Sequence, residues 1–400
     1  MDSKIYIVGG GPAGCLLAGK LAAQGLDVVV FEEHPKIGLP DHCAGLVNYK
    51  NFQKFFNPPK NIIKNTVQGA ILRYNQCEIW ISRRVKEAYV IDRAKLDHYL
   101  ALKAQEKGAV IKVNQKIVKV EKSSGGFKLI SAAGESFKEA DAIVNAAGVK
   151  GLFSKTLNPA SSKYFKVIPA IQYEMHNVKD ISKNYVELYF NNELTPGFFS
   201  WIIPLNEDSV RVGVGARACE LENRLNYFIK KIGFNANRFK ASKLDLIKKG
   251  LILTGGPVNT TYWSGGILLG DAAGQVKPTT GGGLILSGLC ANIAAKILIK
   301  AAEAQNFSNS ILSEYQTLWR SVIGREIQYM KYVRALLDGL DNIHLNKFFE
   351  KIKEDSFISQ LILEGDIDFQ SKAVKSIIKN PKFIKLIPLT ILGLARNTLK

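Results

Sequence analysis

The chain has few cysteines, and they form no recognisable framework. Its 400 residues include only five, Cys15, Cys43, Cys77, Cys219 and Cys290, and no two of them make a CxxC pair. An odd and scattered set argues against a disulfide scaffold and against a zinc site. We therefore expect no bound metal and a reducing compartment.

Long apolar runs and acidic residues are also scarce. No run reaches the roughly 18–20 residues that a membrane-spanning helix needs, and no secretory signal precedes the first expected strand, so we expect a cytoplasmic protein. Only 35 Asp and Glu face 54 Lys and Arg, which leaves a net charge of +19. This excess favours an anionic partner, such as nucleic acid, a phospholipid surface or a phosphorylated substrate, or it serves solubility alone. With 46% hydrophobic residues, the chain is globular and long enough for two domains.

The start of the chain carries the most informative motif. Residues 4–8 are mostly β-branched or aromatic, as in a buried strand, and glycines follow at once as Gly9-x-Gly11-x-x-Gly14. A helical pattern from Cys15 to Gln24 comes next, and then a second apolar strand, Asp27–Phe31, which ends at Glu32. The order strand, glycine turn, helix, strand and acid is typical of a dinucleotide-binding βαβ unit.

Each part of this unit has a mechanical role. Gly9 makes the tight turn, Gly11 lets the backbone approach a pyrophosphate, and Gly14 lets the helix pack closely on the strand. The phosphates would lie at the helix N-terminus, where free N–H groups favour anions. Glu32 would accept hydrogen bonds from an adenosine ribose. A glycine turn with a purely structural use is the alternative.

A second glycine motif follows another apolar strand. It contains Gly270-Asp-Ala-Ala-Gly274, and the glycines at 281–283 open a long apolar helix expected from about Leu284 to Gln305. A carboxylate at Asp271, at the carboxyl end of the sheet, can accept a hydrogen bond from a ribityl hydroxyl. The helix N-terminus would stabilise negative charge on a reduced flavin. An aspartate that only caps a helix is the alternative, but the two motifs together predict FAD.

The remaining patterns predict an α/β fold: a Rossmann-type FAD-binding domain, an inserted, mainly antiparallel β-sheet substrate domain and a helical C-terminal region. The first part of the FAD-binding domain is expected at residues 1–160, with 67–90 contributing to the substrate domain. The substrate domain spans 161–250, the FAD-binding domain resumes at 251–306, and a basic helical region covers 307–400. Within these limits we expect a parallel strand at 141–148, strands at 164–168, 170–175, 186–190, 198–203 and 209–214, and helix over 220–240.

The chain resembles flavoproteins of the p-hydroxybenzoate-hydroxylase type and, within them, the geranylgeranyl reductase family, over roughly residues 3–330. The resemblance is carried by Gly9-Gly-Gly-Pro-Ala-Gly14, Glu32, Asp41-His-Cys-Ala-Gly45, Ile91-Asp-Arg93, Trp201-Ile-Ile-Pro204 and the run from Gly270 to Gly283. That last run is similar to archaeal members that saturate isoprenoid chains of membrane lipids. The resemblance implies that FAD is contacted by Ala13, Glu32, Cys43, Ala44, Gly45, Arg93, Ile117, Asp271, Gly283 and Leu284.

A reductase of this type would deliver a hydride to an unactivated isoprenoid double bond, and this step also needs a proton. The pocket should therefore be long, apolar and dry. Phe199, Trp201, Ile203 and Pro204 are the candidate substrate-binding residues. Ordinary core residues that face inward from a sheet would show the same pattern.

Cys43 is the candidate catalytic residue. The resemblance places it beside the flavin ring, where it would donate a proton, poise the flavin or gate the ring. A free cysteine is more often a small buried hydrophobe, although an irregular Gly/Pro/His loop argues against that use. His42 is a candidate proton relay, or is only hydrogen-bonded to Asp41. Arg93 would contact the cofactor or the loop backbone, or else lie at the surface.

The expected partners are an isoprenoid lipid and an external electron donor, such as ferredoxin or a nicotinamide nucleotide. No nucleic acid is expected, because no binding module is recognisable. Residues 371–400 contain seven Lys or Arg and no acid. This suits an interfacial helix on the inner face of the cell membrane, or a helix packed on the enzyme. The alternative functions are a flavin monooxygenase or epoxidase with an apolar substrate, and a flavoprotein that passes electrons to a partner protein.

Overall fold

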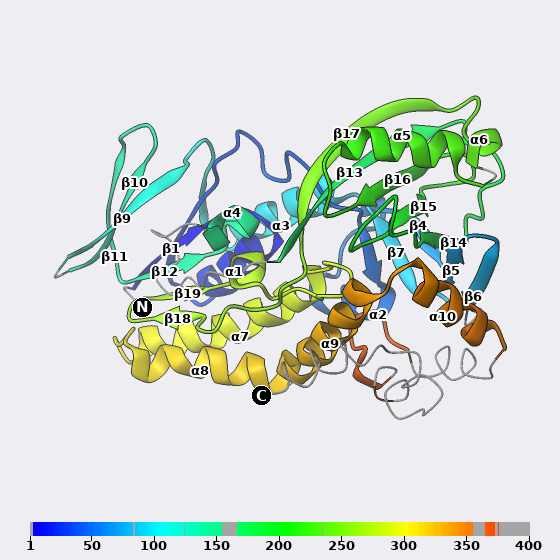
Figure 1. Cartoon of the computed structure of the whole chain (residues 1–400). Coiled ribbons are helices and arrows are strands. Elements are labelled where there is room, and N and C mark those ends of the chain that lie inside the picture. Colours follow the sequence, from blue (N-terminus) through cyan, green and yellow to red (C-terminus); the bar gives the residue numbers. More distant parts are fainter. Residues whose placement is uncertain are drawn as a thin grey trace.

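The computed structural model describes residues 3–82, 85–123, 125–153, 166–233, 235–354, 365–372 and 375. Two larger and two smaller sheets lie next to one another, with helices along their outer faces (Figure 1). The helices are α1 (Pro12–Ala22), α2 (Tyr49–Phe56), α3 (Arg93–Glu106), α4 (Gly148–Phe153), α5 (Leu221–Lys231), α6 (Asn235–Arg238), α7 (Leu284–Glu303), α8 (Asn309–Trp319), α9 (Arg325–Gly339) and α10 (Asn342–Glu354).

The strands are distributed along the chain from Lys4 to Leu268. They are β1 (Lys4–Val8), β2 (Asp27–Phe31), β3 (Leu46–Asn48), β4 (Ile63–Val67), β5 (Gly69–Tyr74), β6 (Cys77–Ser82), β7 (Ala88–Ile91), β8 (Val110–Lys112), β9 (Ile117–Ser123), β10 (Gly126–Ser131), β11 (Ser136–Ala140), β12 (Ala142–Asn145), β13 (Val167–His176), β14 (Tyr185–Tyr189), β15 (Ser200–Pro204), β16 (Val210–Gly215), β17 (Lys243–Leu253), β18 (Tyr262–Trp263) and β19 (Gly266–Leu268). Short helical turns are η1 (Lys60–Ile62), η2 (Gly270–Ala273) and the π-helical η3 (Arg320–Gly324).

A six-stranded sheet holds the start of the chain, in the order β18-β19-β12-β1-β2-β8. Its pairs are parallel except β18 with β19. Side chains of β1 alternate between two cores, as a strand's geometry requires. Ile5 and Ile7 pack on the side of α1 and α7, whereas Tyr6 and Val8 pack against the small β11-β10-β9 sheet. The parallel strand expected at 141–148 is confirmed as β12.

The second large sheet has the order β17-β13-β16-β15-β14-β5-β6. It is antiparallel except for β14 with β5. One face packs on α5 through Leu225 and Phe228. The other face carries Trp201 and Ile203, which share an apolar cluster with Val90 of the three-stranded β3-β7-β4 sheet. The expected class, a parallel sheet with an added antiparallel sheet, is confirmed; the exact domain boundaries stay a prediction.

Three details differ from the expected elements. Helix α1 begins at Pro12 and not at Cys15, because proline is pre-organised for the first turn of a helix. The strand expected at 170–175 and the end of the one expected at 164–168 form one strand, β13, which begins at Val167 and runs through Pro169; residues 164 and 165 lie outside the described residues. Strand β17 was not expected at all: its leucines and lysines lack a regular alternation, since it is an edge strand with several half-exposed apolar residues.

Helix α7 corrects the expectation about long apolar segments. Its 20 residues are long and apolar enough to cross a membrane by length and composition alone. However, 61% of its most apolar window is buried inside the protein, and its buried residues share one core with α1 and β1. A buried core helix passes the same test, so this feature is weak support for a membrane span.

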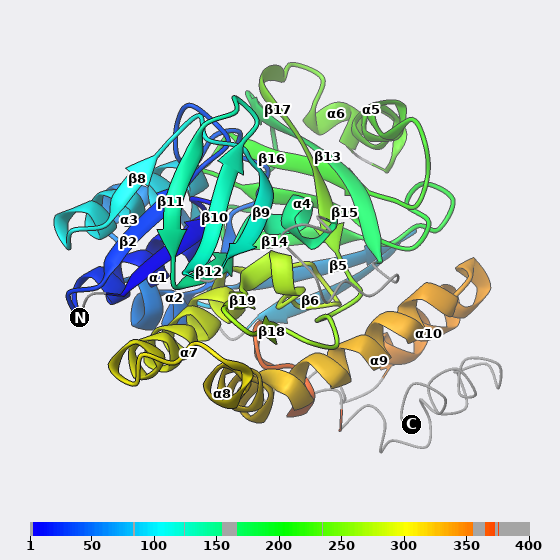
Figure 2. The same cartoon turned by 90° about the vertical axis from the view of Figure 1, so that its left-hand side faces the viewer.

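Helices α8, α9 and α10 follow one another along the lower edge of the molecule in Figure 2. Residues 365–372 then return to the loop that precedes α7, where Lys277 Nζ contacts Asp368 Oδ1 at 2.9 Å. The described part of the region after 307 is thus largely helical, as expected. Most of the basic tail at 371–400 lies outside the described residues.

The buried carboxylate of Glu187 yields a prediction about stability. Arg73 Nε and Arg238 Nη2 donate to it at 2.8 and 2.7 Å. Burial raises the pKa of Glu187, but Arg238 and Arg73 outweigh burial and hold that pKa below its ordinary value of 4.5. The stabilisation is therefore present above the unfolded-state pKa and is lost as pH falls through the folded-state pKa. Glu187→Gln should lower the free energy of unfolding by about 3–5 kcal/mol at neutral pH.

Urea unfolding of both proteins over a pH series measures this difference. It should shrink as the pH falls below about 4.5, because the carboxyl of the unfolded chain is protonated first, and it should be lost once the pH passes the lower folded-state pKa and the native carboxylate is neutral like the amide. A deficit that stays constant down to the lowest accessible pH would show that the charge of Glu187 is not what holds the two arginines.

Candidate functional site

The turn between β1 and α1 is built on close backbone contact. Gly9 has φ +111°, and its N–H donates to Phe31 O at 2.8 Å. A Cβ at Gly9 would lie 2.3 Å from Ala146 O, and a Cβ at Gly14 would lie 2.1 Å from Gly9 O. Both positions therefore require glycine. Gly11, the residue that precedes α1, differs: a Cβ there would meet nothing within 4 Å, so open space remains in front of the helix N-terminus.

Glu32 lies beside this turn and is already engaged by the protein. Its Oε2 accepts from Gly10 N at 2.9 Å, while Oε1 accepts from His34 N at 3.0 Å and contacts His34 Nδ1 at 2.5 Å. A carboxylate offers about four acceptor positions, so a further donor can still be accommodated. The hydrogen bonds to Gly10 and His34 were not expected from the sequence. The ribose contact of Glu32 stays a prediction.

The second glycine motif adjoins the first. Asp271 lies in η2, just beyond β19, and a Cβ at Gly270 would lie 3.2 Å from Ala13 Cβ. A Cβ at Gly283, the residue before Leu284 and α7, would lie 2.7 Å from Asp271 Oδ1. Within the described residues, the Asp271 carboxylate makes no hydrogen bond. Burial raises the pKa of Asp271, and the charge of Arg93 opposes that shift.

Arg93 is the first residue of α3 and faces the same region. Its Nε and Nη2 donate to Asp97 at 3.2 and 3.1 Å. Burial lowers the pKa of Arg93, but the neighbouring carboxylates, above all Asp97, raise it above its ordinary value overall. The structure thus brings Arg93 near both Asp271 and Cys43, and a free surface position is excluded because the side chain is largely buried.

Cys43 is half-buried in the loop between β2 and β3. Its N–H donates to Asp41 Oδ1 at 2.9 Å, and its Sγ accepts from Gly45 N at 3.3 Å. Gly45 has φ +74°, which favours glycine. His42 is exposed, and no hydrogen bond of its ring is found among the described residues. Ala44 packs against the apolar cluster that contains Trp201.

The expected substrate residues lie on or beside β15. Trp201 and Ile203 are buried in the apolar cluster with Ala44, and Phe199 packs against it, with its ring stacked on Phe198 at a centroid distance of 4.1 Å. Pro204 ends the strand and is buried. A small hollow opens next to Phe199 and is lined by Phe190, Asn192, Phe198, Phe199, Arg334, Leu337 and Leu345.

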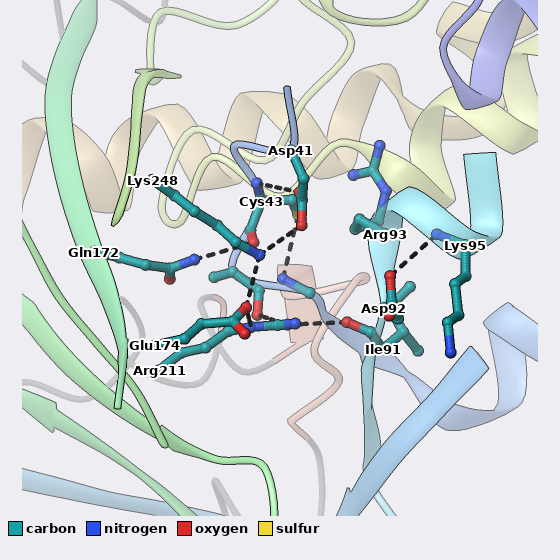
Figure 3. Close-up of polar contacts among 12 residues, drawn as sticks. Asp41, Cys43, Ile91, Asp92, Arg93, Lys95, Gln172, Glu174, Arg211 and Lys248 are labelled. Atoms are coloured by element: carbon teal, nitrogen blue, oxygen red, sulfur yellow. Dashed lines mark hydrogen bonds and ion pairs between the residues drawn. The ribbon is translucent and has the colours of Figure 1, made fainter. Parts of the chain in front are cut away.

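Gln172 links this cluster to the cysteine loop. Its Oε1 accepts from Trp201 Nε1 at 3.1 Å, and its Nε2 donates to Cys43 O at 3.2 Å (Figure 3 shows the second contact). One amide therefore connects a candidate substrate residue with the candidate catalytic residue. Ile117, the first residue of β9, is buried in a cluster with Phe31, the residue before Glu32, and its contact with FAD stays a prediction.

Four further residues at the loop were missed by sequence reasoning: Gln172, Glu174, Arg211 and Lys248. Each is a polar or charged residue within a strand of the seven-stranded sheet. A charged residue such as Arg211, within a run of valines and glycines, is a signal that could have found one of them. It marks a buried partner but does not say which one.

Comparison with solved structures defines the class of protein. The chain superposes on a geranylgeranyl bacteriochlorophyll reductase-like protein from Thermoplasma acidophilum with a TM-score of 0.82, 23% identity and complete coverage of both chains. A flavin-dependent brominase gives a TM-score of 0.71 at 16% identity, over 94% of this chain and 97% of the brominase. The fold is therefore that of the FAD-binding flavoproteins.

The family follows from the sequence comparisons. The family described as lycopene cyclase protein matches residues 4–355, and the chain belongs to it. An uncharacterized protein of Methanocaldococcus jannaschii is 31% identical over 382 residues, with 95% of each chain covered. A digeranylgeranylglycerophospholipid reductase of the same organism is 29% identical over 389 residues, covering 95% of this chain and 96% of the relative. The expected resemblance to such reductases is confirmed.

The residues at the two glycine motifs fit FAD. Open space lies in front of α1 at Gly11, where a pyrophosphate would meet free backbone N–H groups. The Asp271 carboxylate, without a hydrogen bond among the described residues, stands beside the start of α7. The contact between Ala13 and Gly270 brings both motifs to one site, as a ligand that spans them requires.

Gly11 and Gly14 should respond differently to a methyl group. Gly14→Ala drives a Cβ into the Gly9 carbonyl, so it should destabilise the protein by about 1–3 kcal/mol. Gly11→Ala meets open space and should leave the unfolding free energy of flavin-free protein within about 0.5 kcal/mol of wild type. It should still weaken FAD binding about tenfold or more, because the methyl occupies the approach to the pyrophosphate.

Chemical unfolding and flavin fluorescence titration of flavin-free protein measure the two effects. If Gly11→Ala bound FAD as tightly as wild type, the pyrophosphate would not lie at the N-terminus of α1.

Proposed function

We propose that this protein is an FAD-dependent reductase that saturates C=C bonds of geranylgeranyl chains, with archaeal-type membrane glycerophospholipids as the substrate class. The observation that best supports this function is the position of the Cys43 loop. On one side the loop adjoins the first glycine motif and the start of α3, since a Cβ at Gly10 would lie 2.4 Å from Ile37 Cδ1 and a Cβ at Gly38 would lie 2.9 Å from Ala94 Cα. On the other side it contacts the apolar cluster around Trp201 through Gln172. The similarity of this chain, over almost its full length, to proteins named digeranylgeranylglycerophospholipid reductase supports the same function.

FAD would be held by the residues of both glycine motifs. Gly9, Gly11, Ala13 and Gly14 would receive the pyrophosphate, and Glu32 the ribose. Asp271, Gly283 and Leu284, at the start of α7, would face the flavin end. Bound and reduced, the cofactor supplies a hydride for an alkene.

The protein must supply a proton and exclude water. The Sγ of Cys43 accepts from the N–H of Gly45 at 3.3 Å, and the next residue, Ala44, packs against the apolar cluster. We assign the thiol as the proton donor, with its conjugate thiolate facing the positive charge of Arg93. Phe199, Trp201 and Ile203 would surround the chain with apolar surface, so that no water competes for the proton.

An anaerobic reaction tests this function. The FAD-loaded protein is reduced with dithionite and mixed with digeranylgeranylglyceryl phospholipid, while absorbance follows flavin reoxidation and mass spectrometry follows the lipid. We expect reoxidation without O2 and gains of two hydrogens per double bond. Flavin that stays reduced until air is admitted, followed by an oxygenated lipid, would assign a monooxygenase. An isomerised lipid of unchanged mass would instead match the cyclase after which the family is described.

Cys43→Ala should separate cofactor binding from chemistry. The variant should bind FAD with an unchanged spectrum but reduce the alkene at least about a hundredfold more slowly, because general acid catalysis contributes about 10²–10⁴-fold. Single-turnover reoxidation of reduced flavin by lipid measures this rate. Cys219→Ala, at an exposed cysteine, is the matched control and should behave as wild type. Full turnover in Cys43→Ala would remove the thiol from the mechanism.

Contact with the membrane is part of the proposal, together with an external electron donor and a cytoplasmic location on the inner face of the membrane. Its support is the net charge of +19 and the basic sequence of residues 371–400. The full-length protein should sediment with phosphatidylglycerol vesicles at low salt and be released as salt rises, since each basic residue near the surface contributes about 1 kcal/mol. Equal binding to neutral phosphatidylcholine vesicles would contradict an electrostatic contact.

A further inference from the structure

Four charged side chains meet beneath the Cys43 loop. Lys248 Nζ lies 2.6 Å from Asp41 Oδ2 and 2.7 Å from Glu174 Oε1. The same Glu174 oxygen accepts from Arg211 Nε at 2.8 Å. Figure 3 shows these contacts as one connected group, which we call the ion cluster: Asp41, Glu174, Arg211 and Lys248.

The ion cluster joins two parts of the chain that are far apart in sequence. Asp41 belongs to the loop between β2 and β3, which begins at the six-stranded sheet. Glu174, Arg211 and Lys248 come from β13, β16 and β17, three neighbouring strands of the seven-stranded sheet. The cluster therefore fixes the position of the loop relative to that sheet.

The ion cluster reaches the backbone on both sides of Cys43. Arg211 Nη1 donates to Ala44 O at 2.8 Å and to Ile91 O at 2.9 Å. Lys248 holds one oxygen of Asp41, and the other oxygen accepts from Cys43 N at 2.9 Å. The guanidinium leaves no room for a side chain at position 45, where a Cβ would lie 2.2 Å from Arg211 Nη1.

Burying the four charged groups of the ion cluster costs desolvation free energy, and holding the Cys43 loop in place is a reason to bear that cost. Arg211 and Lys248 are only 2% and 6% exposed, and the group is neutral overall, with two acids and two bases. Apolar residues of similar volume often stabilise a fold as well as a buried ion pair does. Charged groups hold a loop in one geometry, however, because their hydrogen bonds have fixed lengths and directions.

We propose that Lys248 and Arg211 are positioning residues that hold the Cys43 thiol at its working place through Asp41 and the Ala44 carbonyl. The catalytic consequence rests on the proposed function, whereas the position of the thiol does not. Loss of Lys248 frees Asp41, so the loop opens and Sγ becomes more accessible to solvent.

The test uses Lys248→Met, which keeps most of the apolar stem, in the full-length, FAD-loaded protein. Alkylation of Cys43 by iodoacetamide is followed by mass spectrometry of its peptide, with the exposed Cys219 as an internal standard. We expect the alkylation rate of Cys43 to rise at least about threefold, because a thiol must be both ionised and accessible to react, and the variant makes Sγ more accessible. In the lipid assay kcat should fall about 10- to 100-fold with little change in KM, because a small misplacement of a reacting group costs this much.

Lys249→Met is the matched control. Lys249 is the next residue on β17, is exposed, and its nearest acid is Glu222 at 3.5 Å. This variant should alkylate and turn over as wild type, and Lys248→Arg should restore most of the wild-type behaviour. If Lys248→Met fails to fold, the pair Asp41→Asn with Lys248→Met keeps the charge balanced and should show the same faster alkylation.

A rise of less than threefold in the folded variant, or a fall, overturns the proposal. If the wild-type protein reduces the lipid, a kcat of Lys248→Met that is no lower than the kcat of Lys249→Met also overturns the proposal. If wild type reduces no alkene while Lys248→Met still alkylates faster, the proposed function fails and the positioning role stands.

Discussion

The structure depends on close backbone packing where β1, β2 and β12 end. Gly9 lies between Phe31 O, to which it donates at 2.8 Å, and Ala146 O, only 2.3 Å from where a Cβ would be. This contact lets β1 turn at once into α1 and brings Glu32 next to Gly10. The neighbouring strand β19 delivers Gly270 against Ala13, so the second motif can join the first. Without glycine at these points the strand ends would move apart and the two motifs could not share one ligand.

The loop between β2 and β3 leaves the six-stranded sheet at this edge and contacts the seven-stranded sheet. An irregular loop is usually the mobile part of a site. Here its backbone groups are held from the seven-stranded sheet by Gln172 and Arg211, and its carboxylate by Lys248. The seven-stranded sheet therefore holds the loop at three points around Cys43.

Sequence patterns predicted well those elements whose conformation depends on neighbouring residues alone. The glycine turn, the buried parallel strands and the long helix α7 follow from hydrophobic period, steric demand and helix-start chemistry, and they appear with small shifts at their ends. Strand β17 was missed because an edge strand exposes residues on both faces, so its pattern has no clear period. The partners of the Cys43 loop were missed for another reason. Lys248 and Asp41 are 207 residues apart, and only the folded topology brings them together.

The same scaffold is found in a flavin-dependent brominase at 16% identity, so the fold alone does not choose the chemistry. What distinguishes a reductase is what surrounds the alkene: a proton source, and apolar surface that excludes water. In this chain Ala44, the residue after the half-buried Cys43, packs against the cluster of Trp201 and Ile203, and Gln172 contacts both Trp201 and the Cys43 carbonyl. In the proposed function, the thiol at this boundary would release its proton toward the alkene. Proton donation would then depend on one short loop, which Arg211 and Lys248 of the seven-stranded sheet contact at Ala44 O and at the Asp41 carboxylate.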